Sequence, residues 1–206
     1  MSEHQNPWDK RYAQEGYLFG VEPNAFLAQC NSYLKVGKRA LAVADGEGRN
    51  GVWLAEQGLS VLSIDNSAVA QEKARKLADS RGVRIDLEQV DLAHWTWPQE
   101  AFDVVVAIFI QFAPPELRTE IFRNIKVALK PGGLLLLQGY RPEQIANGTG
   151  GPQQPDHLYT EAMLREAFHD FEIVTLKSHD TPIHEGVGHE GMSALIDLVA
   201  SKPSSE

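Results

Sequence analysis

The sequence predicts an α/β fold in which a mostly parallel sheet lies between helices. After Gly37, short apolar runs alternate with amphipathic stretches, which is typical of strands joined by helices. A glycine-rich turn over residues 44–51 follows the first of these runs and precedes the first helical pattern. The last two apolar runs, 171–179 and 192–200, have no helical pattern between them. We therefore expect the last two strands to pair antiparallel.

The first half of the sheet is predicted from two strand and helix units. The predicted strands are residues 39–45 and 59–65. The helix between them is expected to end at Gly58, which adopts the left-handed conformation without strain. The next helix is expected to begin after Asn66 or Ser67, either of which is a good N-cap, and to end at Gly82.

The later strands differ in the spacing of their apolar residues. Residues 83–90 alternate apolar and polar side chains, which predicts an edge strand with one solvated face. Residues 102–110 are continuously apolar, which predicts a central strand covered on both faces. A helix beginning at Pro115 must stop before Pro131, and a fifth strand follows over 133–139.

The segment after the fifth strand differs in composition. Residues 141–157 are rich in Gly, Pro and Gln and lack any period, so we predict a long loop of the kind that often shapes a site. A short helix is predicted over residues 163–168.

Composition limits the function classes. The 206 residues are 43% hydrophobic and 23% charged, as in an ordinary globular domain. A net charge of -9 without a basic run argues against nucleic acid as a partner. The single cysteine, Cys30, excludes an internal disulfide. No apolar stretch reaches the length of a membrane span and the start lacks a targeting signal, so we expect a cytoplasmic protein.

We expect one domain over residues 1–206. Residues 1–37 are predicted to form a helical lid or extension, and residues 38–200 the core. The chain is expected to be a monomer or a homodimer.

The turn contains the pattern GxGxxG at Gly46, Gly48 and Gly51. Glycines there let the backbone approach a ligand, and the N–H groups that begin the helix attract negative charge. The pattern does not identify the ligand. Asp65 ends the second strand, where a carboxylate accepts hydrogen bonds from ribose hydroxyls in NAD sites and in other adenosine sites. Gly51 is expected to belong to the helix, which makes the third glycine of the match a coincidence.

Two carboxylates in the turn disfavour a dinucleotide. Asp45 and Glu47 flank Gly46, and a pyrophosphate charge about 5 Å from either would cost roughly 3 kcal/mol at an effective dielectric near 20. Arg49 offsets part of this cost, and both carboxylates can instead point to solvent. S-adenosylmethionine (SAM) carries a carboxylate, an ammonium and a sulfonium, so a turn of mixed charge suits it better. The chain also lacks the YxxxK pair of short-chain dehydrogenases.

Asp91 offers a second indication of an adenosine site. It ends the third strand near the same sheet edge as Asp65, where it can accept the adenine amine while the Leu92 N–H addresses the ring. The alternative is that Asp91 only caps the following turn.

The chain resembles the class I SAM-dependent methyltransferases, and in particular the branch of the tellurite-resistance and thiopurine methyltransferases. The matching motifs lie within residues 7–140: "WDKRYAQEGYLFGVEPNAFL", "GEGRN", "SIDNS", "QVDL" and "LKPGGLLLLQG". The resemblance implies a Rossmann-like three-layer sandwich whose seven strands lie in the order 3214576, with strand seven antiparallel. It also implies that residues 44–50 hold the methionine end of SAM.

The resemblance further implies that Asp65 holds the ribose, that Asn66 lies against the adenine, and that Asp91 and Leu92 address the adenine edge. The predicted cofactor site comprises Trp8, Phe19, Ala44, Asp45, Gly46, Gly48, Arg49, Asn50, Asp65, Asn66, Ser67, Asp91, Leu92 and Ile108. The family usually has an acidic residue at the position of Ala42 and a first glycine at that of Ala44. We expect Asp45 to supply the missing carboxylate.

Candidate acceptor residues follow the fourth and fifth strands, because ligands of such sheets bind beyond the carboxyl ends of strands. They are Gln111, Phe112, Tyr140 and Arg141. Methyl transfer needs alignment and exclusion of water more than an acid or base, and none of the four is a clear base. The N-terminal aromatic residues are expected either to cover the cofactor or to pack an added helix on the core; they are Trp8, Tyr12, Tyr17, Phe19 and Phe26.

No metal is expected. His184 and His189 in "HEGVGH" are five residues apart in a glycine-bearing turn, whereas the zinc motif HExxH needs histidines four apart on a helix.

Taken together, the motifs predict a SAM-dependent methyltransferase whose acceptor is a small molecule such as a thiol or a chalcogen oxyanion. The alternatives are an NAD(P)-dependent oxidoreductase and a SAM-binding protein without activity.

Overall fold

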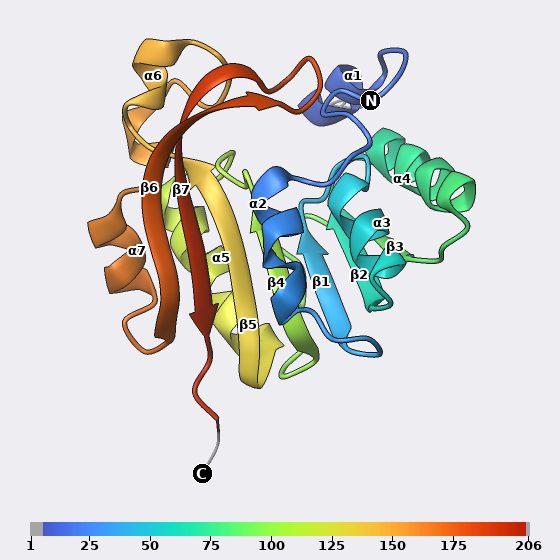
Figure 1. The fold of residues 1–206 in the computed structure, drawn as a ribbon. Helices are drawn as coiled ribbons and strands as arrows, with labels where there is room; N and C mark the ends of the chain where they lie inside the picture. The colour runs from blue at the N-terminus through green and yellow to red at the C-terminus, as the bar shows by residue number, and fades with distance from the viewer. Residues whose placement is uncertain (1–5, 205–206) are drawn as a thin grey trace.

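A computed structural model describes residues 6–204 and contains one seven-stranded sheet (Figure 1). The strands are β1 (Arg39–Val43), β2 (Ser60–Asp65), β3 (Asp86–Gln89), β4 (Phe102–Ile108), β5 (Leu129–Tyr140), β6 (Glu172–His184) and β7 (Glu190–Ser201). Their order in the sheet is β3-β2-β1-β4-β5-β7-β6. This order confirms the predicted fold, with the strand of alternating pattern at one edge and the continuously apolar strand in the centre.

The last two strands run against each other, as the lack of a helix between them predicts. β7 pairs antiparallel with both β5 and β6, while the pairs among β1 to β5 are parallel. Both strands extend beyond the predicted runs, because the turn between them spans only residues 185–189. The resulting hairpin arches over the upper end of the sheet (Figure 1).

Helices cover both faces of the sheet. They are α1 (Pro7–Tyr12), α2 (Ala25–Gln29), α3 (Arg49–Glu56), α4 (Ala68–Arg81), α5 (Pro115–Ala128), α6 (Gln144–Asn147) and α7 (Glu161–Ala167), with short 3₁₀ helices η1 (Cys30–Tyr33) and η2 (Pro155–His157). Side chains of α2 and α3 pack on one face and those of α5 and α7 on the other. Burial of these apolar faces is the main favourable term in folding.

Local signals set several boundaries. Ser67 caps α4 by accepting from the Ala70 N–H at 3.1 Å, and Gly82 ends that helix in the left-handed conformation. α5 ends at Ala128, before Pro131, as predicted. β5 begins directly at Leu129, earlier than the predicted residue 133, because the extended backbone around the proline joins the edge of β4.

The predicted long loop contains more structure than its composition indicates. α6 and η2 both lie within residues 141–157. The side chain of Gln144 in α6 accepts from the Ala194 N–H of β7 at 2.8 Å. This contact anchors the glycine-rich segment to the sheet.

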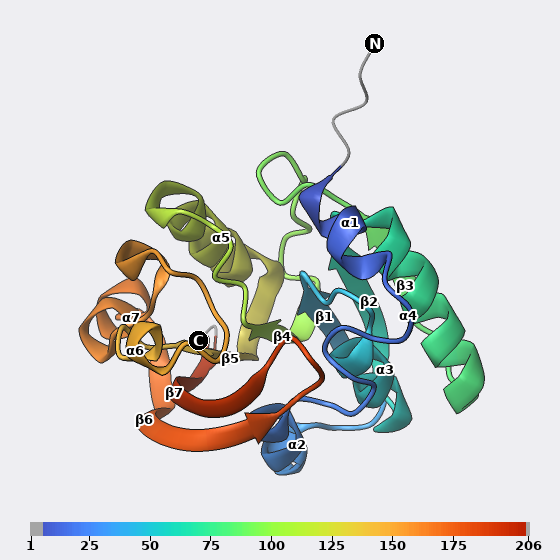
Figure 2. The same ribbon diagram turned by 90° about the horizontal axis from the view of Figure 1, so that it is seen from above.

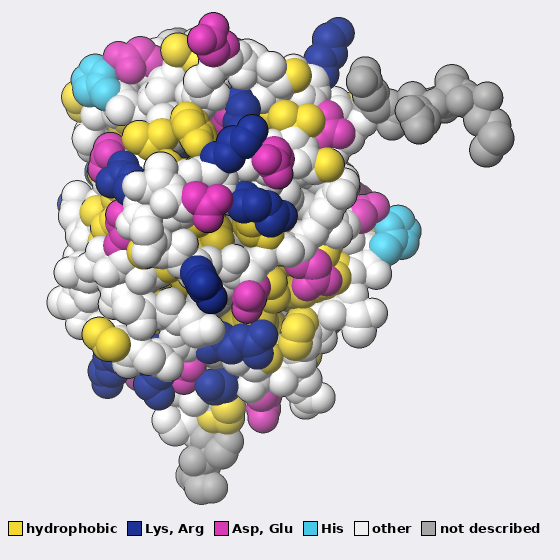
Figure 3. Space-filling model, turned by 90° about the vertical axis from the view of Figure 1, so that its right-hand side faces the viewer, with side chains coloured by type: hydrophobic (Ala, Val, Ile, Leu, Met, Phe, Trp, Pro, Cys, Tyr) yellow, Lys and Arg dark blue, Asp and Glu magenta, His cyan; other side chains and the backbone are white. Residues whose placement is uncertain are grey.

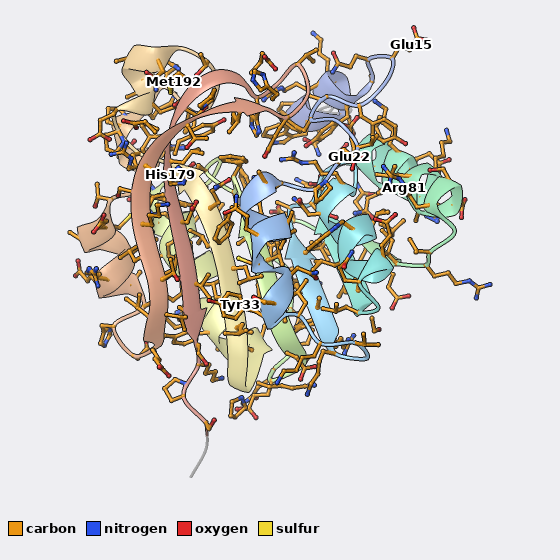
Figure 4. The ribbon with its side chains drawn as sticks, in the orientation of Figure 1. Glu15, Glu22, Tyr33, Arg81, His179 and Met192 are labelled. Carbon is orange, nitrogen blue, oxygen red and sulfur yellow. The ribbon has the colours of Figure 1, made fainter. Side chains whose placement is uncertain are left out.

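The N-terminal segment lies across the upper end of the sheet (Figure 2). Tyr12 of α1 packs against Leu18 and Ala70, and Arg81 of α4 pairs with Glu22 at 2.7 Å (Figure 4). The predicted division into residues 1–37 and 38–200 stays a prediction, and residues 1–5 and 205–206 lie outside the described part of the chain.

The outer surface agrees with the sequence composition. On the face shown in Figure 3, Lys and Arg side chains are interspersed with Asp and Glu. Within residues 6–204, no helix has both the length and the apolar character needed to cross a membrane.

Candidate ligand-binding site

A cavity of about 400 Å³ opens at the carboxyl ends of the parallel strands. Such a position is the usual ligand site of an open α/β sheet. Most of the predicted cofactor residues line it, namely Trp8, Phe19, Ala44, Asp45, Gly46, Arg49, Asn50, Asp65, Asn66, Asp91, Leu92 and Ile108. Trp8 and Phe19 come from the N-terminal segment, and the topology brings the others together because parallel strands end at the same edge of the sheet.

Two predicted cofactor residues support the site from outside the cavity. Gly48 has a φ of +87° and begins α3, where an added Cβ would lie 2.6 Å from the Ala74 Cβ. Its absent side chain therefore allows α3 and α4 to pack closely. Ser67 caps α4 and also donates its hydroxyl to Asp9 of α1, so it fastens the N-terminal segment.

The turn itself is held in left-handed conformations. Gly46 has a φ of +59°, and an added Cβ would lie 2.7 Å from the Tyr12 hydroxyl. Ala44 has a φ of +48°, which costs an L-residue roughly 1–2 kcal/mol. Ala44 thus adopts a left-handed backbone conformation typical of glycine, at the position where the family usually has glycine.

Asp45 lines the cavity, and its carboxyl group is held by donors of the protein. It accepts from the Ser63 hydroxyl at 2.8 Å and from the Gly51 N–H at 3.1 Å. Burial raises the pKa of Asp45 to about 7, with the nearby Asp65 carboxylate adding to the effect. An added Cβ at Gly51 would lie 2.5 Å from the Asp45 Oδ2. Gly51 lies within α3, as predicted, but its place in the match is not a coincidence, because the missing side chain makes room for this carboxyl.

Glu47 faces neither solvent nor ligand. It is buried, pairs with Lys73 of α4 at 2.8 Å and accepts from the Leu18 N–H at 2.7 Å. It is absent from the cavity lining. The sequence argument that its charge repels a pyrophosphate directly is therefore wrong, because Lys73 compensates that charge outside the cavity.

Asp65 borders the cavity with both oxygens oriented by backbone donors. It accepts from the Gly46 N–H at 2.9 Å and from the Ser67 N–H at 2.8 Å. Burial raises the pKa of this carboxyl above its usual value. Each carboxylate oxygen keeps a further lone pair, which can accept from a ligand hydroxyl.

Asp91 caps a turn and also borders the cavity. Its Oδ1 accepts from the Ala93 N–H at 3.0 Å, and its Oδ2 lies 2.9 Å from His94 Nδ1. The hydrogen bond with His94 lowers the pKa of Asp91. The two roles expected of Asp91 from the sequence, capping the turn and accepting from a ligand, are thus compatible with its position.

The candidate acceptor residues separate into two groups. Phe112 and Tyr140 line the cavity, as does Gln111, whose amide also holds the backbone of Tyr140 at both its N–H and its C=O. Arg141 is not among the lining residues and pairs instead with Asp180 and Glu143. Arg141 therefore stabilises the hairpin through these ion pairs.

Several lining residues were not found from the sequence. Arg11 reaches the cavity from α1, and His189 reaches it from the hairpin, whereas Tyr12, which also lines the cavity, is one of the aromatic residues expected to cover the cofactor. Glu185 lies behind the wall and binds the buried Arg49 guanidinium at 2.7 Å. The sequence pattern "HEGVGH" in the hairpin resembles only a metal motif and does not indicate a cavity. Within residues 6–204, no group of three or more His, Cys, Asp or Glu side chains is placed to hold a metal.

The hairpin and the N-terminal segment meet above the cavity. The Gly188 N–H donates to the Leu18 carbonyl at 3.0 Å, and an added Cβ at Gly186 would lie 2.5 Å from Gly20 N. Glu185 also accepts from the Asn24 amide at 3.1 Å and from the Ala25 N–H at 3.1 Å. The two segments thus form one roof.

A SAM-dependent methyltransferase from Methanosarcina mazei has a similar structure, with a TM-score of 0.71, 18% identity, and coverage of 90% of this chain and 100% of that protein. Residues 40–133 match the family described as "Methyltransferase domain". TehB from Haemophilus influenzae has a similar structure, with a TM-score of 0.71, 18% identity, and coverage of 95% of this chain and 65% of that protein. At this identity the likeness establishes the fold alone.

Two curated relatives resemble the chain in part. A carboxy-S-adenosyl-L-methionine synthase from Desulfotalea psychrophila is 37% identical over 86 residues, which cover 41% of this chain and 35% of the relative. A ubiquinone biosynthesis O-methyltransferase from Actinobacillus pleuropneumoniae is 32% identical over 105 residues, which cover 48% and 44%. The chain therefore spans less than half of either relative.

Proposed function

We propose that this chain transfers a methyl group from SAM to a small-molecule acceptor. The observation that carries the proposal is the cavity that joins the left-handed turn after β1 to Asp65 at the end of β2, on a fold shared with SAM-dependent methyltransferases. The family match over residues 40–133 supports it.

The residues present fit SAM. Gly46 leaves backbone space that a side chain would fill, and the helix start behind it favours a carboxylate. Asp65 and Asp91 are acceptors suited to hydroxyl and amine donors of an adenosine. The aromatic ring of Phe19 borders the same space and attracts a sulfonium.

SAM supplies a methyl group on a sulfonium sulfur, which leaves as a neutral thioether when a nucleophile takes the methyl carbon. The chain's own contribution is alignment and exclusion of water. The roof made by the hairpin and the N-terminal segment serves the second purpose, while Phe112 and Tyr140 border the space for an acceptor. A thiol or a chalcogen oxyanion fits a site that offers no clear general base. Membership of the tellurite-resistance and thiopurine branch is part of the proposal, as is action in the cytoplasm.

Calorimetric titration with SAM and with NADH tests the cofactor. We expect SAM to bind and NADH not to bind, because the Asp45 and Asp65 carboxylates border the cavity at the turn and would repel a pyrophosphate. NADH binding without SAM binding would replace the proposal by the oxidoreductase alternative. Transfer of label from SAM to a panel of thiols, chalcogen oxyanions, amines and phenols then separates an enzyme from a binding protein without activity.

Asp65→Ala is expected to weaken SAM binding by roughly 1–3 kcal/mol, because it removes the carboxylate acceptor for the ribose. Titration of the folded variant measures the effect. Asp86→Ala, an exposed carboxylate at the start of β3, is the matched control and should bind SAM as the natural chain does. Unchanged affinity in Asp65→Ala would remove Asp65 from the cofactor site.

A further inference from the structure

The cavity extends beyond the residues proposed for SAM. Its far wall comes from Phe109 and Phe112 after β4, from Tyr140 at the end of β5, and from His189 in the hairpin. Phe109 holds a φ of +54°, an uncommon conformation for a bulky residue that often marks a functional position. This wall is the acceptor side of the proposed enzyme.

Polar atoms without partners gather at this wall. Within residues 6–204, seven buried side-chain polar atoms lack a partner, and three of them belong to cavity residues: Arg49 Nη1, Tyr140 Oη and His189 Nδ1. Leaving such an atom unpaired costs about 1–3 kcal/mol, so native proteins usually provide a partner. The clustering at one wall indicates that a ligand group provides it.

The three groups lie near one another. The rings of Tyr140 and His189 have centroids 5.7 Å apart, and the Arg49 charge acts on the pKa values of both. Arg49 uses its other Nη to bind Glu185, which leaves Nη1 as a fixed donor. Burial raises the pKa of Tyr140, so its hydroxyl remains a donor at neutral pH.

The charges around His189 favour an anion over a cation. Burial, together with the nearby Arg49 and Arg11 charges, lowers the pKa of His189 to about 3, so the imidazole is neutral. An ammonium group placed here would face both guanidinium groups. A carboxylate or thiolate would instead accept from Arg49 and from Tyr140.

The Tyr140 ring is packed on both faces. Phe109 stacks on one side of the ring, with centroids 4.6 Å apart and planes inclined by 25°. Gly151 covers the other side, since an added Cβ would lie 2.7 Å from the Tyr140 Cδ2, and Gly150 lies against the hydroxyl. This packing fixes the orientation of the ring that carries the hydroxyl.

We propose that Arg49, Tyr140 and His189 form a subsite for the anionic group of a small organic acceptor. The inference rests on the proposed methyl transfer and names its acceptor class. The acceptor anion donates an electron pair to the methyl carbon as the carbon–sulfur bond breaks. The product is a neutral methyl ester or thioether, no proton moves, and no general base is needed.

The test uses the full chain saturated with S-adenosylhomocysteine and titrated with benzoate, benzamide and inorganic phosphate. We expect benzoate to bind at least about tenfold more tightly than benzamide, because only the carboxylate forms charge-assisted hydrogen bonds. Arg49→Met should remove this preference, whereas Arg75→Met, at an exposed position on α4, should keep it. Equal binding of benzamide, or phosphate binding as tight as benzoate, would overturn the proposal.

Tyr140→Phe keeps the ring and removes only the hydroxyl, so it tests the subsite even where Arg49→Met does not fold. We expect it to weaken benzoate binding about three- to tenfold while SAM affinity stays within about threefold. Unchanged benzoate binding would count against the proposal. Failure of the natural chain to bind SAM would instead reject the proposed function, while loss of SAM binding in a folded Arg49→Met variant would overturn the assignment of Arg49 to the acceptor subsite and leave it with the cofactor.

Discussion

Glu185→Ala is expected to lower the free energy of unfolding by about 3–5 kcal/mol, because it leaves the buried Arg49 guanidinium without its counter-charge. Both side chains of this pair are less than a tenth exposed. The Ala25 N–H loses its acceptor in the same variant, and the Asn24 amide keeps only the Gln138 Oε1. Urea denaturation measures the change, and SAM affinity should fall with it because the roof loses its fastening.

Glu190→Ala is the matched control for this prediction. Glu190 pairs with His184 on the same hairpin, but both side chains are more than half exposed, so the loss should stay below about 1 kcal/mol. Equal losses in the two variants would mean that the Glu185 pair does not stabilise the fold.

Gly48→Ala is expected to destabilise the chain by about 2–4 kcal/mol. A left-handed φ costs an L-residue roughly 1–2 kcal/mol, and the new Cβ would lie 2.6 Å from the Ala74 Cβ and 2.9 Å from its Cα, which forces α3 and α4 apart. Since α3 begins at the turn that borders the cavity, SAM affinity should also decrease. Denaturation and titration of the same variant measure both effects.

Gly82→Ala separates the two causes. Gly82 also has a left-handed φ, of +68°, but an added Cβ there meets nothing within 4 Å. Its loss should therefore equal the conformational cost alone, about 1–2 kcal/mol. An equal loss in Gly48→Ala would show that the helices accommodate the methyl group without strain.

Local signals were sufficient for most of the fold. Ser67 and Gly82 fix the ends of α4 because capping involves only neighbouring residues. The continuous apolar run of β4 identifies the central strand because both its faces are covered. Most of the predicted cofactor residues reach one cavity for a topological reason, since they follow strands that end at one edge.

Features that depend on distant partners could not be predicted. Glu47 turns away from the cavity because it meets Lys73 and the Leu18 N–H, which lie on other elements. Glu185 acts on Arg49 from 136 residues away in the chain. The sequence pattern around Glu185 has no period and resembles only an imperfect metal motif, so nothing local indicated its role.

The contact between Leu18 and Gly188 bears on when, during synthesis, the chain becomes able to retain a ligand. A nascent chain of 150 residues already contains the glycine turn, Asp65 and Asp91. The hairpin that covers them has not yet been synthesised. Pairing across so long a loop is slow relative to local folding. Nascent chains that end before residue 184 should therefore fold much of their sheet without retaining ligand, and retention should arise when the last hairpin closes.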